Sequence, residues 1–234
     1  MNQITNNYHE ENQYGFLRFN FFEDAYCFLL EKIKSQDIQQ LPGNCIELFG
    51  IAYCIKTNTV PSTLINKLNI PFEWVEKELM ERLSGVPQNP GTAWHKWEQY
   101  LRPKLISGKF HFTWSERIYF QLEKIVSILK ENLYSRRAII SLWDPRVDLD
   151  STAEVPSTIM AQFYFHNNSL NSIFYSRSSN SLLFLPADIY LFAGIQNWIA
   201  HQISLDAGNL SHVIGILYAD IQELNALDKV HHNL

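Results

Sequence analysis

The spacing of apolar side chains predicts helices and strands that follow one another irregularly along the chain. Apolar residues recur at helical spacing over residues 21–34, 71–83 and 115–131, which predicts three amphipathic helices. Ser115 stands where a hydroxyl could cap the third of these. Residues 188–204 form a longer and more uniformly apolar run, which is typical of a buried helix.

Shorter apolar runs, rich in residues that favour strands, predict a sheet. They cover residues 45–57, 138–143, 159–165, 169–175 and 212–220. Asn167-Asn168 predicts a tight hairpin turn between two of these strands. We therefore expect an α+β fold, in which helices pack against a core sheet. No repeat or linker divides the chain, so we expect a flexible N-terminus over residues 1–14 and a single domain over residues 15–234.

Composition narrows the class of protein and its partners. The 234 residues are 46% hydrophobic and 18% charged, as in globular proteins that are not disordered. A formal net charge of −5 argues against nucleic-acid binding, so any phosphate site must be a local cluster of arginines. No apolar run reaches the length of about 18 residues that suggests a membrane span.

The first residues and the cysteines indicate a cytoplasmic location. The N-terminus is polar and acidic and has none of the features of a signal peptide. Cys27, Cys45 and Cys54 form no CxxC pair and leave an odd count. Neither a disulfide framework nor a zinc site is therefore expected.

Arginines at the ends of predicted strands form a candidate phosphate site. Arg136-Arg137 precedes one apolar run, and Arg177-Ser178 follows another. A guanidinium group can bind two phosphate oxygens at once, and a neighbouring hydroxyl adds a donor. Arginines at solvated strand ends are the alternative, and the residues alone leave both interpretations open.

Several motifs in this region resemble those of the thymidylate synthase family. The family's Pro-Cys corresponds in spacing to Pro156-Ser157, and its Gln-Phe corresponds to Gln162-Phe163. Its Arg-Ser-x-Asp corresponds to Arg177-Ser178-Ser179-Asn180, and its Pro-Phe-Asn-Ile to Pro186-Ala187-Asp188-Ile189. Upstream, its Ser-Arg-Arg corresponds to Ser135-Arg136-Arg137. The resemblance implies a thymidylate-synthase-like fold with a mixed core sheet. It also implies a homodimer that forms through this sheet.

The resemblance further implies a phosphate clamp shared between two subunits. Arg136 and Arg137 would reach the nucleotide of the partner subunit, while Arg177 and Ser178 would bind the same phosphate from within. The family's His-x-Tyr, which holds the sugar, has no histidine in the corresponding run here. A ribonucleotide and a deoxyribonucleotide therefore both remain open. The other substrate-binding positions that the resemblance implies are Gln162, Asn180 and Tyr218.

Looser matches lie upstream of these motifs. Glu78 falls where the family keeps a glutamate that handles protons around the base, and Trp94 and Trp97 resemble a Trp-x-x-Trp that lines the folate side of the pocket. A charged helix face and a tryptophan core are the alternatives for these residues.

Ser157 occupies the position of the family's nucleophilic cysteine, whose thiolate adds to C6 of the pyrimidine. A thiol with a reference pKa of about 8.5 is partly ionised at neutral pH. A serine hydroxyl ionises far less readily and needs a neighbouring base. Covalent addition by Ser157 and simple hydrogen bonding to the base are therefore both open.

Asp188 replaces the asparagine with which the family recognises the uracil edge, as in its deoxycytidylate hydroxymethylase branch. A carboxyl group can accept from the exocyclic amine of cytosine, which favours a cytidylate over a uridylate. If the base site is no longer used, Asp188 has no such meaning.

Departures from the family argue against ordinary methylene-tetrahydrofolate chemistry. Asn180 replaces an aspartate that contacts the pterin, Phe184 replaces a glycine that leaves room for it, and the chain stops soon after the last predicted strand. Two functions remain open. One is a transferase with hydroxymethylase-like C5/C6 chemistry on a pyrimidine nucleotide, which suits specialised metabolism. The other is a catalytically silent homologue that binds a nucleotide or phosphate and regulates a partner.

Overall fold

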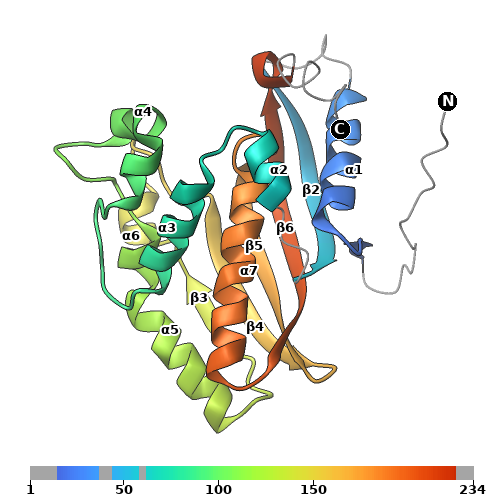
Figure 1. Cartoon of the computed structure of the whole chain (residues 1–234), viewed down its shortest axis with the longest axis vertical. Coiled ribbons are helices and arrows are strands. Elements are labelled where there is room, and N and C mark those ends of the chain that lie inside the picture. The colour runs from blue at the N-terminus through green and yellow to red at the C-terminus, as the bar shows by residue number, and fades with distance from the viewer. Residues whose placement is uncertain (1–14, 37–43, 58–61, 225–234) are drawn as a thin grey trace.

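The computed structural model describes residues 15–36, 44–57 and 62–224, and its strands form one mixed sheet. The strands are β1 (Leu17–Arg18), β2 (Cys45–Lys56), β3 (Ile139–Ser141), β4 (Thr158–His166), β5 (Ser169–Asn180) and β6 (Asp206–Asp220). They lie in the order β1-β2-β6-β5-β4-β3 (Figure 1). The pairs β1–β2 and β5–β6 are parallel, and the others are antiparallel. This confirms the predicted α+β class with a mixed core sheet.

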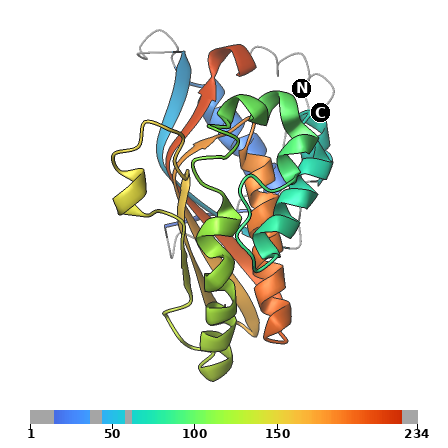
Figure 2. The same cartoon turned by 90° about the vertical axis from the view of Figure 1, so that its left-hand side faces the viewer.

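The four predicted helices are present as α1 (Phe22–Lys34), α3 (Phe72–Leu83), α5 (Trp114–Glu131) and α7 (Leu185–Gln202). Of these, α1, α5 and α7 contact strands of the sheet, while α3 packs on α5 and α7. The structure adds the short helices α2 (Ser62–Lys67), α4 (Glu98–Leu101) and α6 (Pro145–Asp148), and 3₁₀ turns at Ala93–Trp97 and Arg102–Lys104, which were not predicted. Figure 2 shows α3, α5 and α7 on the same side of the sheet. The predicted flexible segment, residues 1–14, lies outside the described residues.

The predicted cap of α5 was wrong by two residues. The cap is Thr113, whose hydroxyl accepts from the backbone N–H of Glu116 at 3.2 Å. Ser115 lies inside the first turn, and its hydroxyl donates to the carbonyl of Gln88 at 2.9 Å. The Thr-x-x-Glu spacing of Thr113 and Glu116 is a capping-box pattern, which is the signal that identifies the true start of the helix.

The strands that border the candidate site are longer than their apolar runs predicted. Asn167 and Asn168 both have positive φ, at 49° and 58°, which confirms the expected tight turn between β4 and β5. β5 then continues past Tyr175 to Asn180, which is paired with Tyr218 of β6. The continuation is rich in serine and has no apolar period, so pairing with β6, rather than local pattern, keeps it extended.

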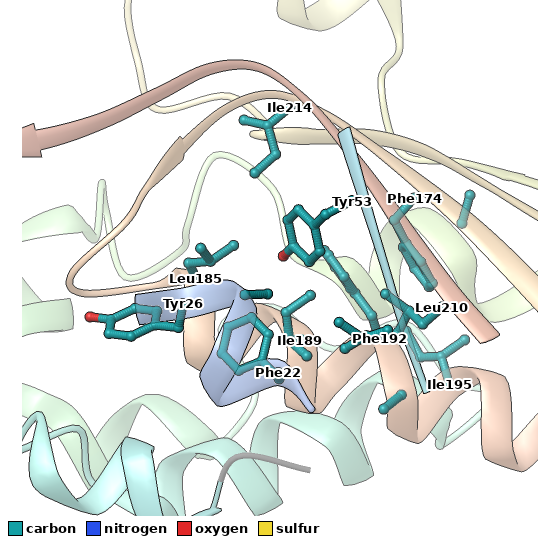
Figure 3. Close-up of a cluster of buried hydrophobic side chains, with 14 of the residues drawn as sticks. Phe22, Tyr26, Tyr53, Phe174, Leu185, Ile189, Phe192, Ile195, Leu210 and Ile214 are labelled. Atoms are coloured by element: carbon teal, nitrogen blue, oxygen red, sulfur yellow. The ribbon is translucent and has the colours of Figure 1, made fainter. Parts of the chain in front are cut away.

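The core lies between the sheet and the helices α1 and α7 (Figure 3). Phe22 of α1 and Phe192 of α7 are fully buried there with Tyr53 and Phe174 of the sheet. The rings of Phe174 and Phe192 are stacked, with centroids 4.0 Å apart. Helix α7 is buried along most of its length, as its uniformly apolar sequence predicts.

One polar side chain in this core attaches α7 to the central strands. Gln196 is fully buried. Its carbonyl oxygen accepts from the hydroxyl of Ser172 at 2.6 Å, and its amide donates to the backbone carbonyls of Leu170 at 2.7 Å and Asn209 at 3.2 Å. The amide therefore joins α7 to both β5 and β6 and satisfies polar groups that burial would otherwise penalise.

Gln196→Leu is expected to lower the free energy of unfolding by about 2–4 kcal/mol, because it leaves a hydroxyl and two carbonyls buried without these partners. The measurement is urea denaturation followed by circular dichroism. Asn197→Ala, at the exposed next position of the same helix, is the matched control and should change stability by less than about 0.5 kcal/mol. Equal effects of the two substitutions would contradict the role of the buried amide.

Candidate functional site

A cavity of about 380 Å³ lies beside α3, where β4 begins and where β5 and β6 end. It brings together predicted site residues that are far apart in the sequence. Those that line it are Glu78, Ser157, Arg177, Ser178, Asn180, Asp188 and Tyr218. The convergence of these polar groups on one cavity makes it the candidate functional site.

Arg177 fixes the segment that carries Ser157. The backbone N–H of Arg177 donates to the carbonyl of Ser157 at 2.8 Å. Its guanidinium group donates to the carbonyls of Pro156 at 3.0 Å and Val155 at 3.3 Å, and also to the hydroxyl of Ser178 at 3.3 Å. The guanidinium thus orients the neighbouring hydroxyls as well as placing a positive charge at the cavity.

Arg136, Arg137 and Gln162 do not line the cavity. The two arginines are exposed and precede β3. The side chain of Gln162, on β4, donates to the backbone carbonyl of Arg136 at 3.1 Å. Within one subunit these residues therefore form a separate group. The assignment of Arg136 and Arg137 to the phosphate site stays a prediction that needs a second subunit, and the substrate-binding role of Gln162 also stays a prediction.

Glu78 is paired with a buried cation that sequence analysis missed. The Nε of Arg82 lies 2.8 Å from the Oε1 of Glu78, and the guanidinium group stacks on Trp114, 3.9 Å from the ring centroid. The Arg82 side chain is 6% exposed, and its Nη1 has no hydrogen-bond partner. The i,i+4 spacing of the two residues on a helix was the available signal. Glu78 therefore does not face solvent as a free charge.

Asp188 lies on the first turn of α7 and is the most perturbed carboxyl group of the cavity. Protein encloses most of the side chain, and a small part of its surface remains accessible. Burial raises the pKa of Asp188 to about 7, the nearby charge of Arg82 opposes this rise, and Glu78 adds to it. At neutral pH the group is therefore divided between an acid that can donate and a carboxylate that only accepts.

Asn180 is engaged by its own turn. Its side-chain carbonyl accepts from the backbone N–H groups of Leu182 at 3.0 Å and Leu183 at 2.9 Å, and its amide donates to Glu223 at 3.2 Å. These bonds shape the turn that leads into α7. Tyr218, its neighbour across the β5–β6 pair, also lines the cavity, and burial raises the pKa of its hydroxyl.

Aromatic side chains form one wall of the cavity, with Phe184 among them. The ring of Phe184 packs with Trp97 and Tyr100 at centroid distances of 5.8 Å and 5.6 Å, and with Trp74 at 6.4 Å. Of the predicted tryptophan pair, Trp94 lines the cavity, while Trp97 is buried in this cluster. Trp97 thus agrees with the core interpretation, while the folate-side role of Trp94 stays a prediction.

A chain of buried polar groups lies behind the serine segment. Thr158 and Ser176 are hydrogen-bonded at 3.1 Å, and Ser176 is bonded to Nε2 of His212 at 2.9 Å. The Nδ1 of His212 lies 3.1 Å from the hydroxyl of Tyr53. Burial lowers the pKa of His212 to about 3, so this histidine is neutral at physiological pH. The chain is structural and does not line the cavity.

The described part of the chain offers neither a metal-binding cluster nor a membrane-spanning helix. No group of three or more His, Cys, Asp or Glu side chains there is placed to hold a metal ion. Within the same residues, no helix has the length and apolar character needed to cross a membrane.

The amino-acid sequence of the chain is similar to that of a known protein family. The family model described as thymidylate synthase matches residues 47–229, which is most of the chain. The chain belongs to the thymidylate synthase family. This confirms the family that the motifs around Ser157 and Arg177 resemble.

Similar proteins carry thymidylate synthase as one part of a larger chain. A bifunctional dihydrofolate reductase-thymidylate synthase from Paramecium tetraurelia is 34% identical over 109 residues, and one from Glycine max is 33% identical over 123 residues. The alignments cover 47% and 53% of this chain and 23% of each relative. The matched part therefore spans less than a quarter of either relative.

The raised pKa of Asp188 predicts a pH dependence of stability. The folded state keeps the proton up to a pH of about 7, whereas an unfolded aspartate releases it near 4. The free energy of unfolding should therefore fall as pH rises from about 4 to 7, and above pH 7 Asp188 should cause no further change. Asp188→Asn removes the ionisable group and with it this pH dependence. The variant should therefore lose less stability between pH 5 and pH 8 than the wild type.

The measurement is urea denaturation at the two pH values, taken as the difference between wild type and variant. The exposed Asp150 supplies the control, because Asp150→Asn should leave the wild-type pH dependence unchanged. Parallel curves for the wild type and Asp188→Asn would show that ionisation of Asp188 is not suppressed by burial.

Proposed function

We propose that the protein is a transferase that activates the C5–C6 bond of a pyrimidine nucleoside monophosphate, and that its substrate is a cytidylate. The observation on which this rests is the convergence of Ser157, Glu78 and Asp188 with the Arg177-Ser178 pair on one cavity. A nucleotide bound there would meet a hydroxyl, two carboxyl groups and a phosphate-binding group. Membership of the thymidylate synthase family supports this reaction class.

Phosphate binding is assigned to Arg177 and Ser178. The Ser178 hydroxyl already accepts from the guanidinium of Arg177, so its own proton is free for a phosphate oxygen. Lys104 lines the same cavity, paired with Glu154 at 2.9 Å, and adds a second cation. Arg136 and Arg137 complete the site in the proposal by reaching it from a second subunit.

Recognition of the base is assigned to Asp188, with Glu78 as the group that moves protons around the ring. In its neutral form Asp188 donates to and accepts from a pyrimidine edge, and in its ionised form it can only accept. Cytosine presents an amine at this edge, which suits an accepting carboxyl group. The Arg82 guanidinium beside Glu78 keeps that carboxylate oriented for its task.

A folate is not part of this proposal, because the residues that the family uses for one do not fit it here. Phe184 occupies its position with a ring that packs against Trp74, Trp97 and Tyr100. The carbonyl of Asn180 is occupied by backbone N–H groups of its own turn. The chemistry proposed therefore stops at activation of C5, before any one-carbon donor.

A second function, a silent homologue that binds a nucleotide and regulates a partner, is favoured by one observation. The guanidinium of Arg177 already donates to the carbonyls of Pro156 and Val155. An arginine that braces its own loop can be retained for structure alone. The two functions differ in whether Ser157 reacts.

Exchange of the C5 proton separates them. CMP, dCMP, UMP and dUMP are each incubated with the protein in heavy water, and loss of the C5 proton signal is followed by NMR. We expect exchange with a cytidylate, because C5 becomes basic only after addition at C6, and we expect Ser157→Ala to abolish it. Ser127→Ala, at an exposed position of α5, is the matched control and should exchange like the wild type.

Exchange that persists in Ser157→Ala would exclude the serine as nucleophile. Nucleotide signals that broaden without any exchange would support the silent homologue. Exchange confined to UMP or dUMP would overturn the assignment of Asp188 to cytosine.

The shared phosphate site predicts recovery of function in mixed dimers. Arg177→Ala and the double substitution Arg136→Ala, Arg137→Ala should each abolish nucleotide binding when present in both subunits. A mixed dimer has one site with every arginine intact, so binding should return at one site per dimer. Calorimetry of unmixed and remixed proteins measures this, with sedimentation as the control for assembly. No recovery in remixed dimers would place all the phosphate contacts within one subunit.

A further inference from the structure

The serine of this site needs a base that a cysteine in its place would not require, because a hydroxyl ionises only when its proton is accepted as it reacts. Imidazole most often fills this role. Two buried or half-buried histidines lie near the serine segment, and His212 is excluded as the base. It is fully buried, and its ring nitrogens are bonded to Tyr53 and Ser176. Among the described residues, His111 is the histidine that lines the cavity with Ser157.

His111 lines the cavity, and one of its two ring nitrogens is buried. Its side chain is 21% exposed, and its Nε2 is buried without a hydrogen-bond partner. The Oδ1 of Asp148 lies 3.6 Å from Nε2. With Nε2 buried beside Asp148, Nδ1 is the ring nitrogen left to accept a proton. Asn89 holds the preceding backbone, with its side chain bonded to both the N–H and the carbonyl of Phe110.

Asp148 is a fixed negative charge behind this ring. Its side chain is fully buried. Its Oδ1 accepts from Arg117 at 2.7 Å, and its Oδ2 accepts from the backbone N–H of Asp144 at 2.8 Å. These bonds leave the carboxylate little freedom, and they hold its Oδ1 beside Nε2. A carboxylate in this place orients an imidazole and stabilises the imidazolium that forms when the opposite nitrogen takes a proton.

We propose that His111 is the general base that accepts the Oγ proton of Ser157, and that Asp148 is the residue that positions it. The inference rests on the proposed addition of Ser157 to C6. It explains how the cavity of a family that uses a thiolate could work with a hydroxyl, since the base supplies the ionisation that serine lacks. The roles of nucleophile, base and orienting carboxylate then fall to residues 157, 111 and 148.

The proton and electrons of the step balance without another reactant. The O–H bond of Ser157 breaks, its proton goes to Nδ1 of His111, and Oγ forms a bond to C6. The electron pair of the C5–C6 double bond moves to C5, which takes a deuteron from heavy water. Loss of the original C5 proton and reversal of the addition return the proton from Nδ1 to Oγ. The net change is exchange of hydrogen for deuterium at C5.

The test combines loss of the base with a nucleophile that does not need it. His111→Gln keeps a polar side chain of similar length but cannot act as a base, so exchange of the C5 proton should fall by about 10²–10⁴-fold. Asp148→Asn should lower it as well. Ser157→Cys should exchange because a thiol supplies its own thiolate, and adding His111→Gln or Asp148→Asn to it should change the rate by less than about twofold.

This rescue separates a base from a structural residue, because damage to the fold would lower exchange with either nucleophile. His95→Gln is the matched control, since His95 is exposed and does not line the cavity. It should exchange at the wild-type rate. Two outcomes would overturn the role of His111 and leave the proposed function intact. In the first, His111→Gln exchanges at the wild-type rate. In the second, His111→Gln loses exchange and the added Ser157→Cys does not restore it.

A second measurement is independent of the proposed reaction. A fluorophosphonate reacts with an activated serine: Oγ bonds to phosphorus, fluoride leaves, and the base takes the proton. Mass spectrometry should find Ser157 labelled in the wild type and unlabelled in His111→Gln. Labelling without any C5 exchange would retain the base and overturn the proposed function. Absence of both labelling and exchange would overturn the two together.

Discussion

The buried amide of Gln196 is the interaction on which the arrangement of the cavity depends. It joins α7 to β5 and β6 at once, through Ser172, Leu170 and Asn209. These three elements also supply the polar groups of the cavity: Asp188 begins α7, while Arg177 to Asn180 and Tyr218 lie at the ends of the two strands. A single side chain in the core therefore ties together the three elements whose opposite ends carry the polar groups of the cavity.

The fold class and most of the polar groups that line this cavity could be predicted from the sequence, because short stretches of the chain carry the signals for both. Helical spacing located α1, α3 and α5, and the motifs from Ser157 to Asp188 identified groups that the fold brings together. The end of β5 escaped notice because its pairing with β6 is a long-range interaction that leaves no apolar period in a serine-rich segment.

The base proposed for Ser157 could not be found from the sequence for a similar reason. His111 belongs to no motif, and the segment before α5 that carries it is held by the side chain of Asn89. The stacking of Arg82 on Trp114 likewise depends on packing between α3 and α5. Contacts of this kind are decided by tertiary structure, which a pattern along one chain does not record.

The bonds made by Arg177 have a consequence for how a ligand acts on this site. The same guanidinium group holds the carbonyls of Pro156 and Val155. An anion bound by it competes with those bonds or draws on its remaining N–H groups, so the anion acts on the group that holds the segment bearing Ser157. Occupancy of the anion site and placement of the hydroxyl are thus thermodynamically linked, and each must alter the other by the same free energy.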